Sequence, residues 1–142
     1  MTLRLPQAMR DEMVAQAIVE LPNECCGIIV AKDGAAQRLY RTRNAEASPF
    51  RYVIDPRDLL RIETEADDNG WQVHVIYHSH VASDAYPSPT DVRLSQWPGN
   101  PPSDLYPDAY YVLVSLKDRD NPSVRAYRIN GGVVSEEPLE TV

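Results

Sequence analysis

Cysteine and histidine are scarce in this sequence of 142 residues, and their scarcity limits the kinds of site that it can form. The two cysteines, Cys25 and Cys26, are neighbours, and adjacent cysteines rarely form a disulfide with each other. Without a C-x-x-C motif, a cysteine-based zinc site is excluded as well. The sequence has only three histidines. Any metal that the protein binds must therefore be held by histidine and carboxylate side chains.

Positive charge and long apolar segments are also in short supply. Lysine and arginine number 14 against 21 aspartates and glutamates, which gives a formal net charge of −7. A nucleic-acid-binding surface would need a basic face, so this class of partner is not expected. No apolar run approaches the roughly 20 residues that span a bilayer, and the N-terminus lacks the apolar core of a signal peptide. We therefore expect a cytoplasmic protein that binds neither nucleic acid nor membrane.

The residues that are present are typical of an ordinary soluble domain. Hydrophobic residues make up 43% of the chain and charged residues 25%, which fits a folded globular protein. The length is enough to bury a core without covalent cross-links, so residues 1–142 are predicted to form a single domain. Nothing in the sequence predicts a particular oligomeric state.

Periodicity predicts an α/β fold, with a mixed β-sheet flanked by helices. Helical spacing of apolar residues covers 6–21, and Asp55-Pro56 marks the start of a second helix that ends near residue 66. A shorter helix is expected over 88–96, followed by an irregular loop over 97–108, which contains four prolines. The predicted strands cover residues 26–31, 38–43, 50–54, 72–80, 109–116, 123–129 and 133–137, with a hairpin turn at 130–132.

Two histidines lie one residue apart at the end of the predicted strand 72–80. Alternate residues of a strand point to the same face, so His78 and His80 can reach one ion. They stand at the carboxyl end of the strand, where open α/β sheets usually bind ligands. An H-x-H pattern is a weak signal by itself, and both residues could be structural. His74 shares their parity but is assigned a structural role, because an open zinc site needs no fourth protein ligand.

A third ligand is predicted in the segment that follows. Asp91 can return to the histidines across the loop 81–87 and complete a set of two imidazoles and one carboxylate, which suits zinc, iron or another first-row metal. The run from Ser88 to Asp91, SPTD, is also typical of a helix start with Ser88 as N-cap. The two interpretations are compatible, because a helix start can hold both side chains toward a metal.

A hydrolytic metal site also needs a general base close to the attacking water. Glu24 is the candidate, because it stands between the first helix and a buried apolar strand, an unusual place for an unpaired charge. The alternative is that Glu24 is a solvated loop carboxylate at the surface. A run of further carboxylates is predicted to form a solvated helix face: Glu63, Glu65, Asp67 and Asp68.

Together these residues resemble the signature of the JAMM (MPN+) metalloproteases. That signature is a glutamate followed at a distance by H-[ST]-H-x7-S-x2-D, and every position is matched: Glu24, His78, Ser79, His80, Ser88 and Asp91. The resemblance implies that the two histidines and Asp91 bind one zinc ion per chain and that Glu24 is the catalytic acid and base. It further implies that Ser88 donates a hydrogen bond to the oxyanion. The implied fold is a mixed sheet between helices, related to that of cytidine deaminases.

The resemblance also implies a function. Members of the family hydrolyse peptide or isopeptide bonds after the C-terminal Gly-Gly of ubiquitin or ubiquitin-like proteins. The segments 77–95 and 109–115 look most like prokaryotic peptidases that release cysteine from a small β-grasp sulfur-carrier protein. The expected partner is therefore a ubiquitin-like sulfur-carrier protein with a Gly-Gly C-terminus. The segment 44–56 is expected to form part of the substrate groove.

Other functions are weighed against this one. The chain could be a deconjugating isopeptidase that removes a ubiquitin-like modifier from a lysine side chain. It could also be a non-catalytic module that binds ubiquitin-like proteins and uses zinc only structurally. A nucleobase or nucleoside deaminase is disfavoured, because its chemistry needs H-x-E with P-C-x-x-C and neither motif is present.

Overall fold

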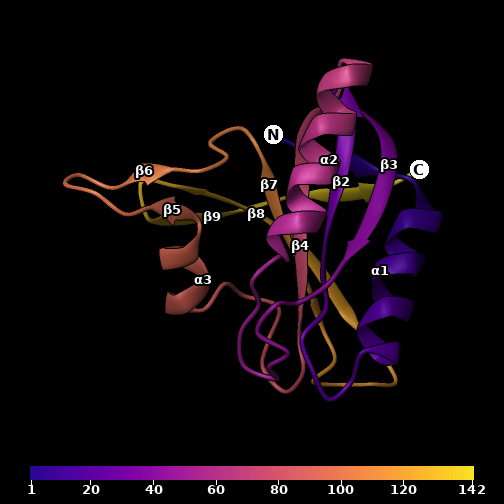
Figure 1. Cartoon of the computed structure of the whole chain (residues 1–142). Helices are drawn as coiled ribbons and strands as arrows, with labels where there is room; N and C mark the ends of the chain where they lie inside the picture. Colours follow the sequence, from indigo (N-terminus) through magenta and orange to yellow (C-terminus); the bar gives the residue numbers. More distant parts are fainter.

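A six-stranded β-sheet forms the centre of the computed structural model, which describes residues 1–142 (Figure 1). Its strands are β2 (Cys26–Lys32), β3 (Ala35–Thr42), β4 (Gln72–His80), β7 (Tyr110–Ser115), β8 (Ser123–Asn130) and β9 (Val133–Glu137). They lie in the order β3-β2-β4-β7-β8-β9. Strands β4 and β7 are parallel, and all other neighbours are antiparallel. The predicted α/β fold with a mixed sheet is confirmed.

Two long helices cover the two faces of this sheet. Helix α1 (Gln7–Val19) packs Met13 against one face, and helix α2 (Pro56–Asn69) packs Ile62 against the other. Because both faces are covered, β2, β4 and β7 are buried over most of their length, and the sequences of β2 and β7 are nearly continuous apolar runs. The predicted cap of α2 is present, since the Asp55 side chain accepts a hydrogen bond from the backbone nitrogen of Arg57 at 2.8 Å.

The connection between the parallel strands β4 and β7 carries helix α3 (Pro89–Leu94) and a small hairpin. The hairpin consists of β5 (Gln96–Trp97) and β6 (Ser103–Asp104), and it projects beyond α3 in Figure 1. The prediction of a wholly irregular loop over 97–108 is therefore wrong at these positions. A short antiparallel pair accommodates the prolines because they lie in the turn between the two strands or after the second one.

The predicted strand over 50–54 is also wrong. Within this segment only Ile54 makes a β-bridge, an isolated one with Asn44. The Asn44 side chain takes up the neighbouring backbone groups, because its Nδ2 donates to the carbonyl of Arg51 at 3.0 Å and its Oδ1 accepts from the amide of Val53 at 3.1 Å. Backbone groups that are already paired with a side chain cannot join a ladder, so the segment forms an ordered loop.

Two further strands bring the ends of the chain together. Strand β1 (Leu3–Leu5) pairs in parallel with β10 (Leu139–Thr141), and Leu3 and Leu5 are buried in the core on the α1 side of the sheet. Neither strand is among those predicted, because each has only three residues and too short an alternation to be recognised. No helix in the structure combines the length and the apolar composition that are needed to span a bilayer.

Candidate metal centre

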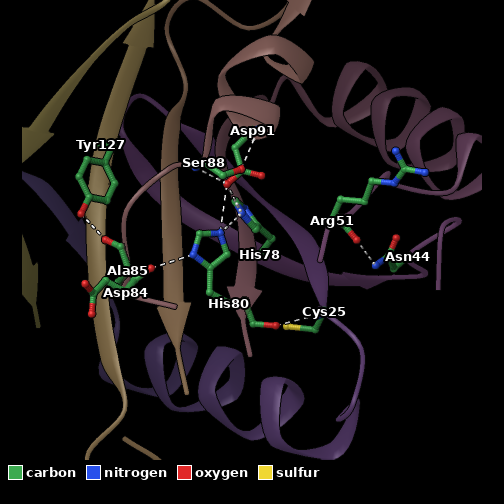
Figure 2. A network of polar contacts seen from close by, with 11 residues as sticks. Cys25, Asn44, Arg51, His78, His80, Asp84, Ala85, Ser88, Asp91 and Tyr127 are labelled. Carbon is green, nitrogen blue, oxygen red and sulfur yellow. Dashed lines mark hydrogen bonds and ion pairs between the residues drawn. The ribbon is translucent and has the colours of Figure 1, made fainter. Parts of the chain in front are cut away.

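Three side chains converge at the carboxyl end of β4. The Nε2 atoms of His78 and His80 are 3.3 Å apart, and each lies 3.1 Å from Oδ2 of Asp91 (Figure 2). All three residues are buried, with 1%, 4% and 5% of their surface exposed. One ion could contact all three atoms.

Asp91 is held in place by the start of helix α3. The Ser88 side chain accepts a hydrogen bond from the backbone nitrogen of Asp91 at 3.1 Å, and Oδ2 of Asp91 accepts one from the backbone nitrogen of Ser88 at 2.8 Å. This reciprocal pair is a capping box, and Pro89 occupies the first helical position. The predicted helix start is thus present, and the same contacts aim the carboxylate at the two histidines.

The two histidines are supported in different ways. Nδ1 of His80 lies 2.8 Å from the backbone carbonyl of Asp84. Because a carbonyl only accepts, Nδ1 carries the proton, which makes Nε2 the atom available to a metal. His78 has no hydrogen-bond partner at Nδ1, but the ring of Tyr52 stacks on it with centroids 4.2 Å apart.

The donor set fits a metal ion. Burial by itself would raise the pKa of Asp91, but the favourable interactions of its carboxylate with the imidazoles of His78 and His80 outweigh it and hold this pKa well below its usual range. The carboxylate is therefore ionised at any physiological pH, as a metal ligand must be. Two nitrogens and one oxygen suit zinc and other first-row metals, and three protein ligands leave room for water.

Glu24 lies next to this centre. It is 3% exposed, its Oε1 has no hydrogen-bond partner, and burial raises the pKa of its carboxyl to about 8. The alternative of a solvated surface carboxylate is therefore wrong. Together with His80 and Ser88, Glu24 lines a pocket of about 290 Å³ whose remaining walls come from Pro49, Phe50 and residues 81–83.

The position of Glu24 is set by contacts with two distant segments. Its backbone nitrogen donates to the carbonyl of Ser48 at 2.9 Å, and its carbonyl accepts from Nδ2 of Asn44 at 3.1 Å. The next residue, Cys25, donates its backbone nitrogen to the Ser79 hydroxyl at 2.8 Å. Ser79, the middle residue of the H-S-H motif, thus joins the Glu24 segment to β4 and has a structural role.

His74 lies outside the centre, as its structural assignment requires. The pairing of β2 with β4 passes from Ile29–Val75 to Val30–Val73 and skips His74, which marks a β-bulge. The bulge reverses the faces, so His74 packs against the ring of Tyr110 on the α1 side of the sheet. Strand periodicity alone would have placed it on the same side as His78.

Three contributors to the site were not singled out by sequence reasoning. These are Tyr52, which stacks on His78, the carbonyl of Asp84, which orients His80, and the amide of Asn44, which holds Glu24. Only the expectation that 44–56 borders the groove pointed toward two of them. Pro49 and Phe50 do line the pocket, as that expectation implies.

Comparisons with known proteins agree with this architecture. The family model described as prokaryotic homologs of the JAB domain matches residues 6–130. The CysO-cysteine peptidase of Mycobacterium tuberculosis is 40% identical over 134 residues, which cover 93% of this chain and 86% of that protein. The chain belongs to the JAB family, as the JAMM-like pattern of residues predicted.

The chain is also similar to a relative with a different name and to a protein of solved structure. The desampylase of Haloferax volcanii is 32% identical over 104 residues, covering 68% of this chain and 75% of that protein. A protein from Desulfitobacterium hafniense, whose structure was determined in solution, superimposes on this structure with a TM-score of 0.82 at 29% identity. The match covers 100% of this chain and 93% of the other protein's chain.

Proposed function

We propose that this JAB-family protein is a zinc-dependent peptidase that cleaves the bond after the C-terminal Gly-Gly of a small ubiquitin-like sulfur-carrier protein, releasing cysteine from a carrier-cysteine adduct. The observation that carries the proposal is the convergence of two Nε2 atoms and one carboxylate oxygen beside a buried glutamate. The 40% identity to a CysO-cysteine peptidase, over nearly the whole chain, supports the choice of substrate. In this proposal the chain acts as a single domain in the cytoplasm.

His78, His80 and Asp91 would hold one zinc ion per chain. Such an ion supplies Lewis-acid chemistry, because it lowers the pKa of water and polarises a carbonyl group. The three ligands are buried and mutually oriented before any substrate arrives, so no reorganisation of these side chains is needed during the reaction.

Glu24 is the proposed proton carrier. Burial raises the pKa of its carboxyl to about 8, and a carboxyl with a pKa near neutrality can both accept and return a proton. The Glu24 carboxylate takes a proton from the attacking water and then donates it to the leaving amine. Its unpartnered Oε1 leaves an acceptor free for this transfer.

Ser88 is the proposed oxyanion donor. Its hydroxyl oxygen accepts the hydrogen bond from the Asp91 backbone, so the hydroxyl hydrogen remains free to donate. Because Ser88 lines the same pocket as Glu24 and His80, that hydrogen can point to the oxygen of a carbonyl under attack.

The test uses a carrier protein with a C-terminal Gly-Gly-Cys and the variant Glu24→Gln. We expect the variant to bind zinc as the wild type does and to cleave the adduct about 10²- to 10⁴-fold more slowly, the usual contribution of a general base. Glu12→Gln, which changes an exposed carboxylate paired with Arg41, serves as the matched control and should cleave normally. Cleavage by Glu24→Gln at the wild-type rate would refute the mechanism, and no cleavage by the wild type would favour a binding module.

A second candidate function is deconjugation of a ubiquitin-like modifier from a lysine side chain. The pocket beside Glu24 is lined by no lysine or arginine, so no cationic side chain is in place to pair with the free carboxylate of a cysteine leaving group. A lysine within a protein presents no such carboxylate. The relative named desampylase supports the same alternative. Comparing rates on a carrier-cysteine adduct and a carrier linked through a lysine Nε decides between the two.

A further inference from the structure

Three consecutive backbone carbonyls in the loop after β4 each accept a hydrogen bond from a side chain of a different strand. The pairs are Ser115 Oγ of β7 with Ser83 at 2.6 Å, His80 Nδ1 of β4 with Asp84 at 2.8 Å, and the Tyr127 hydroxyl of β8 with Ala85. We refer to the segment 83–85 with its two outer donors, Ser115 and Tyr127, as the carbonyl clamp. The clamp surrounds the one carbonyl that contacts a predicted metal ligand.

The carbonyl clamp is built from buried parts. Tyr127 is 1% exposed, and Ser115 and Ala85 are also buried. Ala85 and Tyr127 share a small apolar cluster with Leu113, which fixes the ring under the loop. Figure 2 shows Tyr127 and His80 next to the Asp84–Ala85 segment, with a dashed contact from Tyr127 to Ala85 and another from His80 to Asp84. A loop would otherwise be among the more mobile parts of such a fold.

The middle carbonyl determines how His80 is presented. Because it accepts from Nδ1, it keeps the proton on that nitrogen and sets the rotation of the ring, and Nε2 then faces Asp91. If the loop moved, the imidazole could rotate or exchange its proton between the two nitrogens. The other histidine, His78, has no comparable acceptor and depends on the stacked ring of Tyr52.

We propose that Tyr127 of β8 and Ser115 of β7 are positioning residues. They fix the loop whose Asp84 carbonyl His80 contacts, and in this way they orient His80 for metal binding. Neither side chain belongs to the cluster that could hold the ion, and their hydroxyl groups donate to the loop instead, Tyr127 to Ala85 and Ser115 to Ser83. The inference rests on the metal site of the proposed function, but not on the identity of the substrate.

The experiment compares zinc affinities, measured by competition with a chromophoric chelator, for the whole protein and its variants. Tyr127→Phe and Ser115→Ala each remove one outer hydrogen bond of the clamp and keep the packing of the ring or the small side chain. Ser115→Ala also removes the acceptor of the Lys117 backbone nitrogen, so Tyr127→Phe is the cleaner variant. We expect each variant to bind zinc about tenfold more weakly, the lower end of the effect of losing outer support at a metal site. Tyr40→Phe is the control, because Tyr40 is a buried tyrosine of β3 and the substitution removes only its hydrogen bond to Glu65. Its zinc affinity should stay within about twofold of wild type.

A second measurement, on the metal-free protein, keeps the inference separate from the proposed function. In the wild type the imidazole N–H proton of His80 should give a distinct NMR signal that exchanges slowly with water, because Nδ1 donates to a fixed carbonyl. The signal should broaden or disappear in Tyr127→Phe and persist in Tyr40→Phe. An unchanged signal with an unchanged zinc affinity overturns the inference. If the wild type shows no peptidase activity, but Tyr127→Phe still differs from it in zinc affinity and in the His80 signal, only the proposed function is overturned.

Discussion

The two halves of the candidate site are assembled in different ways. The ligand half consists of His78, His80 and Asp91, which lie within one strand, one loop and one helix start. The base half consists of Glu24, whose position depends on Asn44 and on the loop that extends to Tyr52. The three ligands are close together in the chain, and the capping box that aims Asp91 is local, although the carbonyl clamp behind His80 reaches from β7 and β8. Glu24 lies far from the ligands in the chain, and its backbone is held by contacts with the loop 44–53.

This difference has a consequence for function. The capping box and the carbonyl clamp can keep the ligands in place even when the loop 44–53 changes. Glu24 has no comparable local support, because its carbonyl and amide are both paired with that loop. Substitutions in the loop should therefore lower the rate of catalysis without removing the metal, and substitutions in the ligand half should remove both.

The largest expected effect is on the ligand half. Asp91→Asn keeps an oxygen that can accept from the Ser88 backbone but removes the charge that both histidines share. We expect zinc affinity to fall by more than about a hundredfold, beyond what loss of an outer hydrogen bond costs, and hydrolysis to cease. Zinc content and the unfolding temperature of the metal-free protein are the measurements. Equal zinc binding in the variant would mean that Asp91 is only a helix cap.

The next effect sharpens the comparison from the side of the base half. Asn44→Ala removes the amide that donates to the carbonyls of Glu24 and Arg51, at 3.1 and 3.0 Å. We expect kcat to fall about tenfold, because a small displacement of a general base lowers the rate, while zinc content stays at the wild-type level. Asn69→Ala, at the exposed end of α2, is the control. A parallel loss of zinc would show that the two halves are not independent.

A smaller effect concerns stability and its dependence on pH. Burial raises the pKa of Glu24 from 4.5 to about 8, so between these values the folded chain binds more protons than the unfolded chain, and its stability falls as pH rises. In metal-free protein, Glu24→Gln should be more stable than wild type at pH 8.5 by about 1–2 kcal/mol. This is less than the full shift implies, because water screens the open pocket.

The same comparison at low pH supplies the control for this prediction. Near pH 4.5 the carboxyl of Glu24 is protonated in the folded chain, so wild type and Glu24→Gln should have nearly equal free energies of unfolding. Denaturant titrations in the presence of a chelator, at the two pH values, measure the difference. A constant difference at both values would indicate that packing, and not the charge, separates the two proteins.

The smallest expected effect tests the contact that joins the two halves. Tyr52→Leu removes the aromatic ring stacked on His78 at 4.2 Å but keeps an apolar side chain against it. An aromatic pair is worth about 0.5–1.5 kcal/mol beyond its area, so zinc affinity should fall by a few fold, less than in Tyr127→Phe. A larger loss in Tyr52→Leu would mean that stacking supports a ligand better than a fixed carbonyl does.

Local sequence was enough to predict the ligand half. Two histidines at alternate positions of a strand must share a face, and Ser88, Pro89 and Asp91 form a capping box within a single turn. The same local reasoning gave the wrong result over 50–54, where Asn44 pairs with the backbone that a strand would have used. It also could not place His74, because a bulge in the pairing with β2 reversed its face.

The sequence therefore specified which side chains are candidates for the metal centre and how they follow one another along the chain, since periodicity and helix capping act over a few residues. Only the tertiary structure decided that Glu24 would be buried beside those ligands, that Tyr52 would stack on His78, and that Tyr127 would reach the loop behind His80. These contacts join residues far apart in the chain, and only the packing of strands and helices around the sheet brings them together.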